Sequence, residues 1–224
     1  MRGKTGKDKV EHINTLINNA GTIIEYNHGH NLIIKIKGIE PGPILAITAH
    51  HDNVHPDYEN CLDNTASVIN LTKIYQRLAD KPPKHDVILA WTDHEETCSL
   101  EKTGIRSLIE TNNIDYLLDL ELTASGSIPL LCEYGKFDFG TGKFWDDIII
   151  SKMPYNNAYA AKAIGGIRGS ACLTIVSESD MHDLRLTGYC KRWSQCHQST
   201  DTFERWYSVV ETEYLINCLV ETLY

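Results

Sequence analysis

Two histidines and an aspartate, His50-His51-Asp52, end an apolar run that begins at residue 43. The run has the length and flanks of a buried strand, and three polar side chains at the end of such a strand need a binding partner. In open α/β sheets, ligands sit just beyond the carboxyl ends of the strands. The end of this strand is therefore the first candidate for a functional site.

Further residues along the chain could complete such a site. They are Asp63, the pair Glu95 and Glu96, Asp119 and His197. Carboxylate oxygens and neutral imidazole nitrogens are good ligands for zinc, and also for manganese or cobalt, and no cysteines are spaced to compete with them. These residue types predict a metal-dependent hydrolase.

The elements that must position these residues alternate between strand and helix. Apolar residues at helical spacing predict a helix over 64–78, beginning directly after Asp63. A second buried strand is expected over 86–93, just before the paired glutamates, and a third over 114–121. This alternation predicts an α/β fold with a mixed, mostly parallel central sheet flanked by helices on both faces.

The remaining patterns predict elements on either side of this core. Helices are expected over 8–20, 100–110, 144–150, 156–164 and 202–223, a hairpin over 22–37, and strands over 128–134 and 171–177. No repeat or low-complexity linker interrupts the chain. Residues 1–224 are therefore expected to form a single catalytic domain.

Composition limits the classes of protein to consider. The 224 residues are 42% hydrophobic and 23% charged, as in globular proteins. A net charge of −9 argues against a nucleic-acid partner, and the one basic stretch, residues 2–9, is expected to be a solvated terminus. No run is long and apolar enough for a membrane span or a signal peptide. Seven cysteines, scattered singly, suggest reduced thiols and a cytoplasmic protein.

Taken together, these motifs resemble those of a known family. In order and rough spacing, the motifs His50-His51-Asp52, Asp63-Asn64, Glu95-Glu96, Leu118-Asp119 and His197 resemble the co-catalytic zinc aminopeptidases of metallopeptidase clan MH, a group that also contains glutaminyl cyclases. The resemblance runs from about residue 33 to 207. Each motif alone is common, but five in this order are not. The resemblance implies the zinc-dependent exopeptidase fold.

The resemblance also implies a ligand set for two divalent metal ions, zinc above all. It assigns His50 and Asp119 to one ion and Glu96 and His197 to the other, with Asp63 bridging both. Two of these positions have an alternative. His51 points to the opposite side of the strand from His50, so a shift of one residue would exchange them. Glu121 falls on the same strand face as Asp119.

Three carboxylates near the ligands have supporting roles in this interpretation. Glu95, next to a ligand, would be the general base that takes a proton from the attacking water and returns it to the leaving amine. Asp52, two residues beyond His50, would orient its imidazole. Asp201, four residues after His197, either ties down its loop or acts more directly.

These residues predict an exopeptidase, foremost an aminopeptidase acting on peptides or related small substrates. Arg168, between two glycines, is a candidate for holding a substrate carboxylate, with Arg185 and Arg192 as others. These arginines keep a carboxypeptidase or N-acyl amino acid deacylase open. A single-zinc glutaminyl cyclase and a non-catalytic binding module are further alternatives. The site is expected to be open, or closed by a second subunit of a homo-oligomer.

Overall fold

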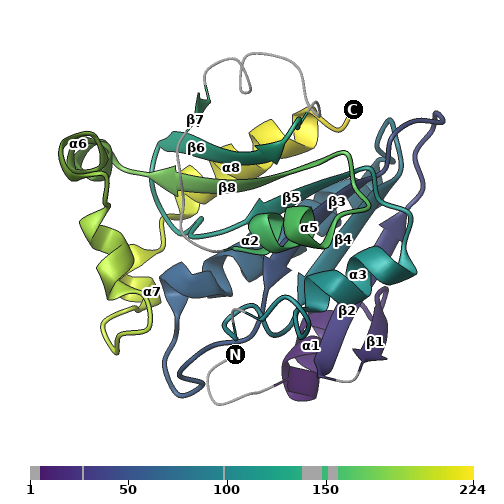
Figure 1. The fold of residues 1–224 in the computed structure, drawn as a ribbon, viewed down its shortest axis with the longest axis horizontal. Coiled ribbons are helices and arrows are strands. Elements are labelled where there is room, and N and C mark those ends of the chain that lie inside the picture. Colours follow the sequence, from purple (N-terminus) through teal and green to yellow (C-terminus); the bar gives the residue numbers. More distant parts are fainter. Residues whose placement is uncertain (1–5, 27, 98, 138–147, 151–155) are drawn as a thin grey trace.

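The computed structural model describes residues 6–26, 28–97, 99–137, 148–150 and 156–224. There an eight-stranded mixed sheet lies between helices on both faces (Figure 1). The strands are β1 (Thr22–Tyr26), β2 (Gly29–Ile36), β3 (Leu45–His50), β4 (Val87–Thr92), β5 (Tyr116–Leu120), β6 (Ile128–Gly135), β7 (Ile149–Ile150) and β8 (Gly169–Val176). The helices are α1 (Gly6–Leu16), α2 (Ala66–Asp80), α3 (Gly104–Thr111), α5 (Asn157–Ile164), α6 (Glu178–Thr187), α7 (Phe203–Trp206) and α8 (Val209–Glu221), with short turns η1 (Cys61–Thr65) and η2 (Lys191–Gln195). The predicted α/β class and mixed sheet are confirmed.

The order of strands places one end of the sheet under the candidate residues. The sheet runs β1-β2-β4-β3-β5-β8-β6-β7, and its four central strands, β4, β3, β5 and β8, are parallel neighbours. β1 pairs antiparallel with β2, β2 with β4, and β6 with β8, whereas β6 and β7 are parallel. The carboxyl ends of the four central strands therefore meet at one edge, where α/β proteins bind their ligands.

Side chains of β3 alternate between two packed layers. Leu45, Ile47 and Ala49 pack in the cluster that includes residues of α1, α2 and α8. Ala46 packs in the cluster of α3 and α5 on the opposite face. Because successive strand residues face opposite sides, the side chain of His50 belongs to the α5 side and that of His51 to the α1 side.

Two predicted helices differ in the structure. The expected C-terminal helix is divided into α7 and α8, because the side chain of Ser208 accepts a hydrogen bond from the backbone N–H of Glu211 and begins a new helix there. The helix predicted over 144–150 lies mostly outside the described residues, and its last two residues form β7. The helix predicted over 156–164 is α5.

Candidate metal centre

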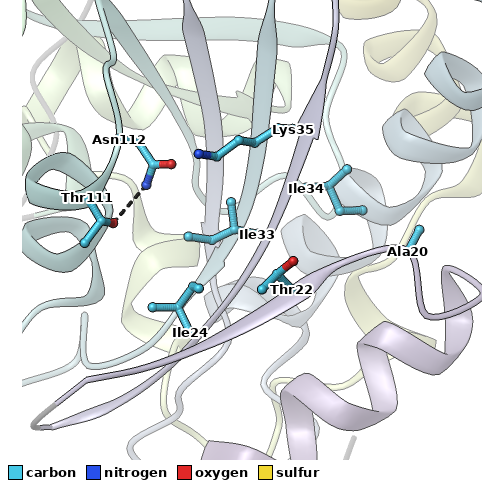
Figure 2. Close-up of a pocket in the computed structure, with 8 residues that line it drawn as sticks. All are labelled: Ala20, Thr22, Ile24, Ile33, Ile34, Lys35, Thr111 and Asn112. Carbon is cyan, nitrogen blue, oxygen red and sulfur yellow. Dashed lines mark hydrogen bonds between the residues drawn. The ribbon is translucent and has the colours of Figure 1, made fainter.

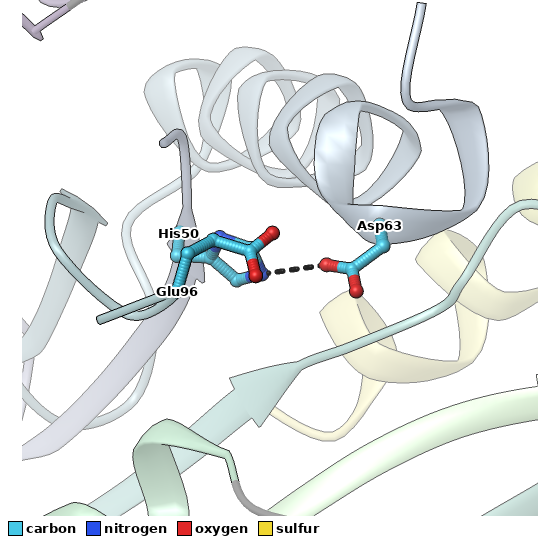
Figure 3. Close-up of side chains that lie close together, drawn as sticks. All are labelled: His50, Asp63 and Glu96. Atoms are coloured by element: carbon cyan, nitrogen blue, oxygen red, sulfur yellow. Dashed lines mark ion pairs between the residues drawn. The ribbon is translucent and has the colours of Figure 1, made fainter. Parts of the chain in front are cut away.

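His50 ends β3 and is 1% exposed. Its Nε2 lies 3.0 Å from Oδ1 of Asp63 and 3.3 Å from Oε1 of Glu121, and its Nδ1 lies 3.3 Å from Oδ1 of Asp52. Figure 3 shows the imidazole facing Asp63. Burial alone would lower the pKa of His50, but the three carboxylates outweigh it and raise that pKa well above 6.5. The buried imidazole is thus surrounded by negative charge.

His197 lies on the other side of Asp63. Its Nε2 is 3.1 Å from Oδ2 of Asp63 and 3.1 Å from Oε2 of Glu96. These hydrogen bonds raise the pKa of His197 to about 10. Burial would raise the pKa of Asp63, but the two histidines hold it well below 3.8. Each carboxylate oxygen of Asp63 therefore faces a different imidazole.

The cluster has the donor atoms that a divalent cation needs. Several of its buried polar atoms form no hydrogen bond within the described part of the chain: Nε2 of His50, Oδ1 of Asp63, Oε1 of Glu96 and Oε1 of Glu121. One ligand atom from each of His50, Asp63 and Glu96 lies within 4.8 Å of the others (Figure 3). Buried charges without hydrogen-bond partners are costly, and carboxylate with imidazole is a donor set suited to zinc. The residues present fit a metal site.

The structure places Asp119 below this cluster. β3 and β5 pair Thr48 with Asp119, and the hydroxyl of Thr48 donates to Oδ1 of Asp119 at 2.7 Å. The same register, continued by two residues, sets Glu121 level with His50. Asp119 is fully buried, and burial raises its pKa to about 6. The geometry therefore favours Glu121, the alternative, over Asp119, because Glu121 contacts His50 and Asp119 lies one layer deeper.

Only one of the two adjacent histidines reaches the cluster. The ring of His51 lies on the opposite face of β3, with its Nε2 2.9 Å from the carbonyl oxygen of His30. Side chains alternate between the two faces of a strand, so His50 shares a face with Thr48 and His51 lies on the other face. The geometry thus favours His50, the preferred residue, over His51.

Asp52 connects the end of β3 with the loop after β4. Its Oδ1 accepts from the backbone N–H of Glu95 at 3.2 Å, and its Oδ2 accepts from that of Glu96 at 3.0 Å. Burial would raise the pKa of Asp52, but its contact with His50 and the positive charges nearby lower it to about 2. One ionised carboxylate thereby orients an imidazole and the glutamate pair together.

Asp201 holds the segment that carries Asp63. Its Oδ1 accepts from the backbone N–H of Leu62 at 2.7 Å, and its Oδ2 from that of Asp63 at 3.4 Å. Within η1, Asp63 and Asn64 lie outside helical φ and ψ, so helical hydrogen bonds alone do not fix this turn. Of the two predicted roles for Asp201, these contacts match tying down a loop.

Glu95 lies beside the cluster without being central to it. It is 7% exposed, and its Oε2 lies 4.0 Å from Nε2 of His50. Burial raises the pKa of Glu95 well above 4.5, and the neighbouring carboxylates of Glu121, Asp63 and Glu96 add to this rise against the opposing charge of His50. A buried carboxyl with a raised pKa is suited to accepting and returning a proton.

The predicted substrate arginines lie elsewhere. Arg168 precedes β8, at the amino end of that strand, whereas the cluster lies beyond the carboxyl ends. Its side chain is 63% exposed, and its Nε is 2.9 Å from Oδ1 of Asp115. Arg192 is buried and donates to the carbonyl oxygens of Ser125 and Ile175. The position of Arg168 argues against a role in substrate binding, and Arg192 holds two backbone carbonyls in place.

A separate groove lies between the β1–β2 hairpin and the end of α3 (Figure 2). It is lined by Ala20, Thr22, Ile24, Ile33, Ile34, Lys35, Thr111 and Asn112. None of these residues belongs to the cluster of histidines and carboxylates. The groove is therefore no part of the candidate metal centre.

Comparison with known proteins gives relatives in sequence and in structure. The vacuolar membrane protease of Candida tropicalis is 25% identical over 181 residues, which cover 79% of this chain and 19% of that protein. A zinc aminopeptidase from Bacillus subtilis has a TM-score of 0.65 at 14% identity, covering 88% of this chain and 49% of its own. A glutaminyl cyclase from Bacteroides thetaiotaomicron has a TM-score of 0.65 at 12% identity, covering 97% and 87%. The chain spans about a fifth of the length of the curated relative.

The relatives correct the predicted location. Matches from Candida tropicalis, Meyerozyma guilliermondii and Lachancea thermotolerans are all named vacuolar membrane protease. The prediction of a cytoplasmic protein is therefore wrong, because unpaired cysteines report on disulfides and do not identify a compartment. Among the helices that the structure describes, none has the length and apolar character to cross a bilayer.

The match to a family covers the whole site. Residues 31–206, which are well over half of the chain, match the sequence pattern of peptidase family M28. That segment includes the cluster from His50 at the end of β3 to His197 after η2. On this match, the chain belongs to peptidase family M28.

Proposed function

We propose that this chain is the catalytic part of a metal-dependent exopeptidase, specifically an aminopeptidase. The observation that carries the proposal is the carboxylate of Asp63, which faces His50 with one oxygen and His197 with the other. Membership of a peptidase family and a fold shared with zinc aminopeptidases support it. Since the chain spans only part of its relatives, the activity of the whole protein belongs to the same proposal.

In this proposal the centre holds two divalent ions, with zinc as the first choice and manganese or cobalt as alternatives. His50 and Glu121 would hold one ion, Glu96 and His197 the other, and Asp63 would be shared. The distances of 3.0–3.3 Å between these partners, together with the unpaired buried atoms, support this set. The set keeps every predicted ligand except Asp119.

Each residue near the ligands has a task in peptide hydrolysis. When bound, divalent ions at such a site lower the pKa of water and stabilise negative charge on a carbonyl oxygen. Glu95 accepts the proton of the attacking water and returns it to the leaving amine, for which its raised pKa is suited. Asp52 keeps His50 and the backbone of the glutamate pair in place during this transfer.

The structure does not support the alternative functions equally. A carboxypeptidase or deacylase needs a cation for the substrate carboxylate, and Arg168 lies at the wrong end of β8 for that purpose. A single-zinc cyclase would leave one of the two histidines facing Asp63 without a metal. The single domain of residues 1–224 and a homo-oligomer stay predictions. The names of the relatives favour the vacuolar membrane as the location of the protein.

Paired substrates test the proposal directly. An aminopeptidase requires a free α-amine, so the zinc-loaded protein is expected to release nitroaniline from aminoacyl nitroanilides and not from their N-acetylated counterparts. A chelator should abolish the release, and added zinc should restore it. Release from the acetylated substrates alone would move the assignment to a deacylase. Cyclisation of an N-terminal glutamine without peptide release would move it to a cyclase.

A further inference from the structure

Lys9 of α1 is a buried lysine behind the proposed centre. It is 2% exposed, although the basic start of the chain was predicted to be solvated. Its Nζ donates to the carbonyl oxygen of His51 at 2.6 Å. Lysine is almost never fully buried unless it is paired. It also precedes residues 31–206, so the match to the family does not account for it.

The carbonyl that Lys9 contacts belongs to the peptide unit between His51 and Asp52. The backbone N–H of His51 donates to the carbonyl oxygen of Thr92 at 2.8 Å, and its ring faces His30. The next residue, Asp52, carries the carboxylate that contacts His50. Lys9 therefore fixes the backbone directly before this carboxylate, from the face of the sheet opposite to His50.

The charges around Lys9 are those of the site. Burial lowers the pKa of Lys9, and the carboxylates of Asp52, Asp93 and Glu96 oppose this by favouring its charged form. The ammonium thus offsets negative charge on the side of the cluster that faces α1.

We propose that Lys9 is a positioning residue of the metal centre: it holds the backbone at Asp52 in place, so that Asp52 orients His50 and the backbone of the glutamate pair. This inference rests on the proposed function. Residues that orient metal ligands change metal affinity by about 10–100-fold when they are replaced. The N-terminal helix is then part of the catalytic unit and not only a cover of the sheet.

The test compares two lysines of α1. Lys9→Met keeps the length of the side chain and removes the ammonium, and Lys7→Met changes a lysine that is 62% exposed and pairs with Glu11 at 3.8 Å. Zinc dissociation constants are measured by competition with a chromophoric chelator. Lys9→Met is expected to weaken zinc binding about tenfold or more. Lys7→Met should match the unchanged protein. With zinc saturating, Lys9→Met should lower kcat and leave KM nearly unchanged.

A purely structural role gives a different pattern. If Lys9→Met lowers Tm of the metal-free protein but binds zinc as tightly as the unchanged protein, the inference is overturned. Lys9→Gln covers the case in which Lys9→Met does not fold, since it keeps a polar side chain that is one atom shorter and so withdraws the donor from the carbonyl of His51. It too should weaken zinc binding, and unchanged binding would overturn the inference. An unchanged protein that binds no zinc would instead overturn the proposed function itself.

Discussion

Asp63 offers each of its carboxylate oxygens to a different imidazole, and the other candidate ligands are arranged around that pair of contacts. His50 meets Glu121 on one side, and His197 meets Glu96 on the other. Several buried atoms of these residues form no hydrogen bond to another of the described residues. A shared carboxylate with a pair of ligands on either side is the arrangement that two-ion hydrolases use.

Replacing each carboxylate by its amide tests whether Asp119 or Glu121 is the metal ligand. Glu121→Gln is expected to reduce the zinc content from about two ions per chain to about one, because a neutral amide is a poor replacement for a carboxylate ligand. Asp119→Asn should retain both ions, since an amide oxygen still accepts from the hydroxyl of Thr48. Zinc per folded chain, measured by mass spectrometry, checks both. The reverse pattern would restore Asp119 as the ligand.

The sequence leads to most of these candidate residues, but its first choice on β5 differs from the residue that contacts His50. Asp63 and His197 follow from order and spacing, and the alternation of side chains along β3 favours His50 over His51. Asp119 and Glu121 share a strand face, and only the pairing of β5 with β3 tells which is level with His50. That register depends on contacts between strands far apart in the chain. The information that the sequence lacked is the strand register, in which Thr48 pairs with Asp119.

At the scale of elements, loops beyond the sheet carry the site, and buried polar contacts hold those loops. Asp201 ties η1 to the segment after His197, and Arg192 ties η2 to the loop after β5 and to the end of β8 through the carbonyls of Ser125 and Ile175. Neither contact has a local sequence signal, because the partners are far apart in the chain. The strands other than β7, and α2, whose periodicity is local, were predicted closely.

Asp201→Asn tests how much the turn at Asp63 depends on this tie. The amide can accept with one atom only, so one buried backbone N–H loses its partner, which costs about 1–3 kcal/mol. We expect a lower midpoint in denaturant and weaker zinc binding. Asp80→Asn, at the exposed end of α2, serves as the control and should change neither. Zinc binding and stability both equal to those of the control would show that the tie is dispensable.

At the scale of the whole molecule, metal binding and folding are linked through protons. The pKa of His197 is raised to about 10 by Asp63 and Glu96, against about 6.5 for an unfolded histidine. A raised pKa stabilises the metal-free fold fully below pH 6.5, and this contribution is lost as the pH rises through about 10. Metal ligands must be deprotonated, so zinc gains affinity in the same direction.

Zinc should therefore raise Tm by more at pH 8 than at pH 6. The reason is that the proton on His197 competes with the metal at the lower pH, and a tighter ligand stabilises the fold more at a given concentration. Thermal unfolding with and without excess zinc at the two pH values checks this. The pH dependence should be smaller with calcium, which prefers oxygen ligands and so competes with protons on the carboxylates but not on the imidazole. A zinc effect that shrinks as the pH rises would contradict the assignment of His197.

Some predictions about the whole molecule were confirmed and others were wrong, according to the kind of information that each one needs. The alternation of strand and helix determined the α/β class, since it reflects a packing rule common to many chains. Location did not follow from the cysteines, and the burial of Lys9 did not follow from the basic start of the chain. Both depend on context that a local pattern lacks: the relatives of the protein in one case, and the packing of α1 behind β3 in the other.

Titration of the metal-free protein with zinc, followed by the hydrolysis of an aminoacyl nitroanilide, tests the central claim most directly. We predict that activity rises with zinc up to about two ions per chain and then levels off. Glu95→Gln should bind the same amount of zinc and lower kcat by about 10²–10⁴-fold. Full activity with no bound metal, or full activity of Glu95→Gln, would contradict a metal-dependent peptidase that uses Glu95 as its base.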